Sequence, residues 1–149
     1  MTDFVETRII SAVRGLLTGR VNELLDEMEC PVPLIEFSSY KGGTAVCPVI
    51  SFSTCEQSEK ERIIRLDAYS MTITFSLIDT PESELYCYAY SGAVGRAFFD
   101  NPTLGGIVDR AIISSKKYNA PKNPHCGEGW GLTVFLRVTV EGINESTRL

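Results

Sequence analysis

The feature that most constrains the fold is the run RLDAYSMTITFSLID (65–79), in which apolar and polar side chains alternate. Successive side chains of a β-strand point to opposite faces, so this alternation predicts one long strand, apolar on one face and more polar on the other. The apolar face consists of Tyr69, Met71, Ile73, Phe75 and Leu77, and the more polar face of Ala68, Ser70, Thr72, Thr74 and Ser76.

Further extended segments are expected on both sides of this run. The closing run LTVFLRVTVEG (132–142) alternates in the same way, and a strand is expected at about 106–117. Two shorter runs, at about 34–39 and 46–54, are plausible strands around a glycine turn and a candidate hairpin. Pro48 restricts the second of these to an edge strand or a strand start. The charged stretch EQSEKER (56–62) is interpreted as a solvated loop.

The first predicted helix covers about residues 3–28, where apolar residues recur at helical spacing and Thr2 or Asp3 is a candidate cap. Gly15 and Gly19 weaken its middle, so one kinked helix and two shorter helices both fit the pattern.

A second helix is expected at about 82–99, with Asp79 or Thr80 as the N-cap and Pro81 at the first position. Its expected buried stripe is Leu85, Tyr86, Ala89, Ala93, Ala97 and Phe98.

The order of these elements predicts the fold class. Strands that follow one another without helical crossovers favour an antiparallel or mixed sheet. We therefore expect an α+β fold with helices packed on one face of the sheet, as a two-layer sandwich. Its 149 residues fit a single domain, 1–149, with a flexible C-terminal tail at about 143–149.

Charge and composition exclude some classes of partner. The net charge is −5, from 14 basic and 19 acidic residues, which argues against a nonspecific nucleic-acid-binding face. No apolar run approaches the length that a bilayer requires, and the N-terminus lacks the features of a signal peptide, so synthesis in the cytosol without a membrane partner is expected. The five cysteines have no paired spacing and are expected as free thiols.

No motif predicts catalysis, a metal or a cofactor. His125 and Cys126 are adjacent in a loop, where neighbouring side chains usually point apart. The glycine-rich GEGWG (127–131) precedes a strand, whereas a phosphate loop opens a helix, so a bend with Trp130 packed at the sheet end is expected. Trp130 and the hairpin tip of YKGGTA are candidate loop contacts, the tip residues being Lys41, Gly42 and Gly43.

The most distinctive turn is DNPTLGG (100–106), between the second helix and the strand after it. Pro102 forbids continuation of the helix, and Asp100 or Asn101 suits a capping or left-handed position. Gly105 and Gly106 permit positive φ, and Leu104 is the one side chain able to anchor the turn to the core. We expect a rigid corner and a candidate inter-subunit contact formed by Asp100, Asn101, Pro102, Leu104, Gly105 and Gly106.

The strand YSMTITFSLID, the helix after it, the segment DNPTLGGIVDRAIISS and the closing strand GLTVFLRVTVEG together resemble the tail terminator or tail completion family. These are small minor tail proteins of long-tailed bacteriophages and related prophages. The resemblance covers about residues 60–142. In that family an NPTLGG-type turn often ends the helix, and the next strand starts with Val-Asp and a charged residue, here Val108, Asp109 and Arg110.

The resemblance implies a structural protein without enzymatic activity or cofactors. Family members form a ring, typically a hexamer, that caps the tail tube, ends its polymerisation and provides a surface for head attachment. The implied partners are further copies of the chain, the tail tube protein and a head–tail connector protein, and no sequence-specific nucleic acid. The implied location is the host cytoplasm during assembly and then the virion tail.

Two alternatives remain open at this stage. One is another phage connector of similar fold, such as a head–tail joining, tube or baseplate subunit. The other is a small ligand-binding or enzymatic domain that uses the polar loop around His125.

Overall fold

A computed structural model describes residues 4–29, 31–37, 46–122 and 128–143. Its elements, in chain order, are α1 (Val5–Leu16), the π-helical turn η1 (Leu17–Val21), α2 (Asn22–Asp26), β1 (Val49–Glu59), β2 (Ile64–Ile78), α3 (Ser83–Asp100), β3 (Arg110–Asn119) and β4 (Glu128–Ile143). The predictions made for Thr2, Asp3, Lys41, Gly42, Gly43, His125, Cys126 and residues 144–149 lie outside the described residues.

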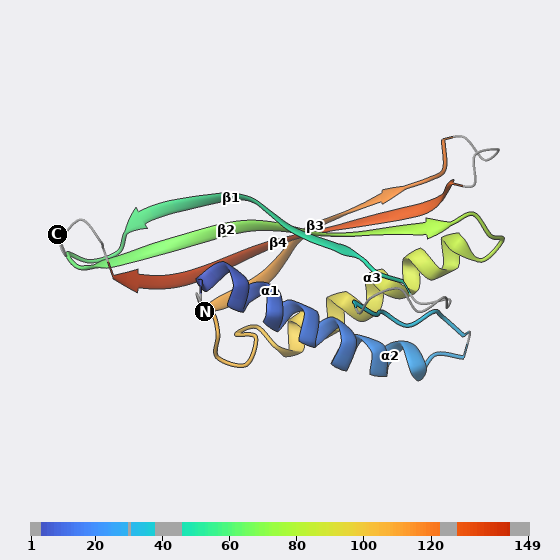
Figure 1. The fold of residues 1–149 in the computed structure, drawn as a ribbon, viewed down its shortest axis with the longest axis horizontal. Helices are drawn as coiled ribbons and strands as arrows, with labels where there is room; N and C mark the ends of the chain where they lie inside the picture. Colours follow the sequence, from blue (N-terminus) through green and yellow to red (C-terminus); the bar gives the residue numbers. More distant parts are fainter. Residues whose placement is uncertain (1–3, 30, 38–45, 123–127, 144–149) are drawn as a thin grey trace.

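The named strands form one open sheet in the order β1-β2-β4-β3, with every neighbouring pair antiparallel. Figure 1 shows the helices on one side of this long, twisted sheet. The predicted α+β class with a helical layer on the sheet is therefore confirmed, and of the two sheet types expected, the named strands form the antiparallel one. Pro48 directly precedes β1, and β1 is an edge strand. This confirms the prediction that Pro48 restricts its segment to an edge strand or a strand start.

The core lies between the sheet and the helices, on the side that the alternating patterns predicted. In β2 the buried side chains include Tyr69, Met71, Ile73, Phe75 and Leu77, and in β4 they include Leu132, Val134, Leu136 and Val138. At its centre, the rings of Phe75 and Tyr90 stack with centroids 4.9 Å apart. The Tyr90 hydroxyl donates a hydrogen bond to the Pro33 carbonyl, at 2.5 Å, and burial raises the pKa of this phenol well above its ordinary value.

The N-terminal helical region is continuous, with a π-helical turn in place of a break. Its core residues are spaced by four: Ile9, Val13, Leu17, Val21 and Leu25. At 3.6 residues per turn, a four-residue step advances about 40° around an α-helix, so such a stripe drifts away from the core. The wider η1 turn, at about 4.4 residues per turn, reverses that drift. This local unwinding keeps the stripe in the core.

The hairpin that contains β1 differs from the prediction. Residues 56–59 of the expected loop EQSEKER continue β1, where they pair with β2, for example Glu56 with Ala68. An edge strand exposed on both faces carries no apolar alternation, so its sequence resembles a loop. The proposed hairpin between 34–39 and 46–54 is wrong in its pairing: β1 pairs with β2, and Ile35 and Val46 form an isolated parallel bridge.

The buried face of α3 also differs from the expected stripe. Leu85 is half exposed, whereas Cys87, Tyr90 and Val94 are fully buried. The reason is that α3 contacts both the sheet and the N-terminal helices, so it buries more than one face. The predicted Thr80 cap is also wrong: the helix is preceded by Glu82, and Thr80 Oγ1 is buried without a hydrogen-bond partner.

The third and fourth strands begin at other residues than predicted. The third strand begins at Arg110, because residues 101–109 form a longer corner than the sequence suggested. The fourth begins at Glu128, so the described part of GEGWG belongs to a strand. The expected bend at Trp130 is therefore wrong.

Candidate functional site: the corner and groove beside β3

The DNPTLGG corner is held by hydrogen bonds at both of its ends. Asn101 Nδ2 donates to the Ala97 carbonyl at 2.9 Å, which caps the last turn of α3. At the other end, the Pro102 carbonyl accepts a hydrogen bond from the Ala111 amide at 2.6 Å and joins the corner to β3. Between them, the Thr103 carbonyl accepts from the amides of Gly106 and Val108. The corner is thus bonded to both elements that it connects.

Three consecutive residues of the corner have positive φ: Leu104 at 50°, Gly105 at 72° and Gly106 at 91°. Positive φ at the two glycines confirms the prediction. Asn101 takes a capping role with φ of −132°, so the left-handed conformation falls later in the turn than expected. Leu104 adopts a backbone conformation that is unfavourable for residues other than glycine. Its side chain is nevertheless buried, with only 7% exposed, which confirms Leu104 as the anchor of the corner to the core.

The Val108-Asp109 pair that follows fixes the corner to the sheet. Val108 is buried in the core. The Asp109 amide donates to the Thr139 carbonyl at 3.0 Å, and Asp109 Oδ2 accepts a hydrogen bond from the Glu141 amide at 2.8 Å. The pairing of β3 with β4 begins at Arg110 and Thr139, so the Glu141 amide has no partner in β3. The Asp109 carboxylate accepts the hydrogen bond of this amide instead.

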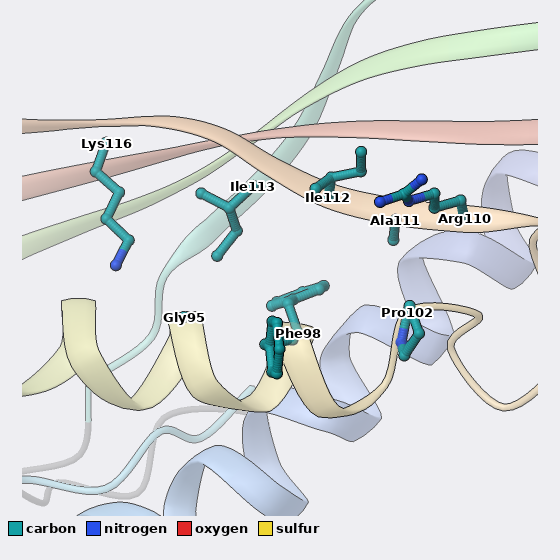
Figure 2. Close-up of a pocket in the computed structure, with 9 residues that line it drawn as sticks. Gly95, Phe98, Pro102, Arg110, Ala111, Ile112, Ile113 and Lys116 are labelled. Atoms are coloured by element: carbon teal, nitrogen blue, oxygen red, sulfur yellow. The ribbon is translucent and has the colours of Figure 1, made fainter.

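An open groove with a volume of about 490 Å³ runs between the end of α3 and β3, next to the corner (Figure 2). Ala111, Ile113 and Lys116 point from the strand toward the helix, and Lys116 Nζ donates to the Ser91 carbonyl at 2.9 Å. Two large apolar side chains at this groove are exposed to solvent: Phe99 is 82% exposed and Ile112 is 43% exposed. The full lining is Gly95, Phe98, Phe99, Pro102, Arg110, Ala111, Ile112, Ile113 and Lys116.

Adjacent phenylalanines give a direct test of this geometry. Replacing Phe99 by serine is expected to change the free energy of unfolding by no more than about 0.5 kcal/mol, because its exposed ring buries little surface in the core. Replacing Phe98, which is 2% exposed, by serine is expected to cost about 3 kcal/mol or more. Urea unfolding of both variants measures the difference. Equal losses in the two variants would contradict the placement of Phe99 outside the core.

Trp130 lies near the start of β4 and is not among the residues that line this groove. It is half-buried in β4, and its ring meets that of Tyr88 edge-on, with centroids 6.0 Å apart. Tyr88 makes a similar contact with Tyr118 of β3, at 5.8 Å. These ring contacts join α3 to β3 and β4, and the role of Trp130 as a loop contact stays a prediction.

Titratable side chains are dispersed over the described part of the chain. No group of three or more His, Cys, Asp and Glu residues able to hold a metal occurs within residues 4–29, 31–37, 46–122 and 128–143. Of the cysteines in these ranges, Cys47 and Cys55 are exposed and Cys87 is buried, where burial raises the pKa of its thiol.

Asp67, which is buried, accepts two hydrogen bonds from Arg65 on the same strand, at 2.7 and 2.9 Å. This pair stabilises β2.

Comparison of the sequence with known protein families finds no matching family, and a search of curated proteins finds no relative. Within its described residues, the structure contains no helix that is long and apolar enough to cross a membrane.

Proposed function

We propose that the chain is a structural subunit of a long-tailed phage or prophage tail, which assembles with further copies into a ring that caps the tail tube. The observation that carries this proposal is the corner at residues 101–109. The segment that resembles the tail terminator family forms a hydrogen-bonded corner directly beside the exposed groove at β3.

The character of the groove supports a protein partner. It is open to solvent, and Phe99 and Ile112 present apolar surface beside the free side of an edge strand. Exposed apolar side chains gathered at a sheet edge are typical of surfaces that other protein chains cover. The net charge of −5 is also compatible with contacts to proteins and poor attraction for DNA. In this role the chain needs no catalytic group and no cofactor.

Deleting the gene from the phage or prophage that encodes it tests the proposal. The expected result is overlong tails without heads, because nothing ends tube polymerisation or offers a head-joining surface. Electron microscopy of the particles measures tail length and head attachment, and expression of the intact chain in trans should restore both.

The same experiment separates the alternatives. Tails of normal length joined to heads would contradict the proposal. Tails of normal length that lack heads would favour a head–tail joining protein in its place.

A further inference from the structure

Both edges of the sheet carry backbone groups without a strand partner among the described residues. The sheet begins with β1 and ends with β3, and these strands have similar lengths of 11 and 10 residues. An unpaired edge is a template for pairing with another chain. A second copy of this chain could therefore extend the sheet at either edge.

The direction of the strands allows this extension to continue from copy to copy. Neighbours in the order β1-β2-β4-β3 are all antiparallel, so β1 and β3 run in opposite directions. If a second sheet continues the first in the same sense, its β1 lies antiparallel to the β3 of the first copy. Each copy then contributes one edge and receives the other, which is the head-to-tail arrangement that closes into rings.

The charges on the two edges favour this pairing over pairing of like edges. Three cationic residues lie on β3: Arg110, Lys116 and Lys117. Two acidic residues lie on β1, Glu56 and Glu59, and no basic residue. Opposite charges on facing strands stabilise a pair and like charges destabilise it. In a pair of two β3 strands every charged residue would be basic, and in a pair of two β1 strands every charged residue would be acidic, so neither pair could form an ion pair between its strands.

Irregularities in the two strands favour one register. The pairing of β1 shifts between Phe52 and Thr54, and the pairing of β3 shifts between Ile113 and Ser115. When Glu56 is placed opposite Arg110, Thr54 lies opposite Ile112 and the two irregularities lie side by side. In this register, residues that lie opposite each other in the two strands point to the same face of the sheet, both before and after the irregularities. A shift of two residues would separate the irregularities and disturb this match.

We infer that β1 of one copy adds to β3 of the next, antiparallel, with Glu56 opposite Arg110, and covers the groove beside Phe99. The inference rests on the proposed function, since it assigns the surfaces through which the proposed ring assembles. Both side chains lie on the face of the sheet away from the helices, because their β-partners, Ala68 and Thr139, lie outside the alternation of core residues.

A charge exchange tests the proposed contact. Glu56→Lys and Arg110→Glu, each alone, should weaken each interface about two- to fivefold, and the loss should compound around a ring. The double variant should recover most of the association, measured by analytical ultracentrifugation. Glu61→Lys, in the turn between β1 and β2, is the matched control and should associate like the original chain.

The double variant also excludes an effect within one copy. Glu56 lies 3.8 Å from Arg137 of its own sheet, and this contact is lost equally in Glu56→Lys and in the double variant. Recovery on adding Arg110→Glu therefore does not come from restoring the contact between Glu56 and Arg137. Single variants without a loss, or a double variant without recovery, would overturn the inference.

Disulfide cross-linking tests the register. Directly opposite residues in an antiparallel pair have Cα atoms about 4.5–5.5 Å apart, which suits a disulfide. In a chain with Cys30, Cys47, Cys55 and Cys126 replaced by serine, Thr54→Cys with Ile112→Cys should give a ladder of linked copies on oxidation. The buried Cys87 is retained. Thr54→Cys with Lys117→Cys, on the same face but distant in register, should give no ladder.

The remaining outcomes are also decisive. Dimers of Ile112→Cys alone would show β3 paired with β3, and a chain that stays monomeric at tens of micromolar would lack the interface; either result overturns the inference. Neither result bears on the gene-deletion phenotype. Overlong, headless tails together with failed cross-linking would leave the proposed function standing on a different interface.

Discussion

Replacing Gly129 by alanine is expected to destabilise the chain by about 3 kcal/mol or more, because β4 has no room for a side chain there. A Cβ atom at this position would lie 2.5 Å from the Ile78 carbonyl oxygen and 2.6 Å from that of Leu77. Both obstacles are backbone atoms of β2, beside the irregular pairing between Ser76 and Ile78. Relief requires the two strands to separate. Thermal and urea unfolding followed by circular dichroism measure the loss.

Gly92→Ala is the matched control for this substitution. Gly92 is an exposed residue in the middle of α3, and a Cβ there would meet nothing within 4 Å. Alanine is expected to stabilise the helix by about 0.5–1 kcal/mol, because glycine loses more backbone entropy on folding. Similar stability of the Gly129 and Gly92 variants would contradict the close approach of β2 and β4 at Gly129.

The second large effect is expected at Leu104. Replacement by aspartate should destabilise the chain by about 3–5 kcal/mol, because it removes a buried apolar side chain and places a carboxylate against the core. Ring assembly should fail with it. Folding close to that of the original chain, with intact assembly, would count against both the anchoring of the corner and its proposed place in an interface.

Two further variants separate packing from backbone conformation at the same position. Both Leu104→Ala and Leu104→Gly lose the buried side chain. With φ at 50°, however, glycine avoids the cost of about 1–2 kcal/mol that other residues meet in the left-handed region. We therefore expect the glycine variant to be at least as stable as the alanine variant, the reverse of the usual order. An alanine variant that is clearly more stable would contradict the left-handed conformation of Leu104.

The parts of the fold that follow from local pattern were predictable. The alternation along residues 68–77 and 132–140 identified two strands and the faces that they bury, because period two is a property of the strand itself. The end of the second helix and the two glycines with positive φ followed from local chemistry, since proline stops a helix and glycine admits left-handed backbone.

Other features depended on contacts between distant segments. The charged end of β1 carried no strand pattern, and only the neighbouring β2 supplies its hydrogen bonds. The burial of Cys87, Tyr90 and Val94 required knowing that α3 is covered on two sides. Phe98 and Phe99 are identical residues next to one another. Only the directions in which their side chains leave α3 decide that Phe98 is buried in the core and that Phe99 is exposed at the groove.

By itself, the sequence determined the α+β class, the two central strands and their buried faces, and the position of the corner at DNPTLGG, because each depends on residues close together in the chain. Only the tertiary structure decided which strands became the edges and what lies beside them. Edge status depends on which segments pair, and this placed Phe99 of α3 and two residues of the edge strand β3, Ile112 and Arg110, around one groove. The DNPTLGG corner thereby also borders the groove that we propose the next copy covers.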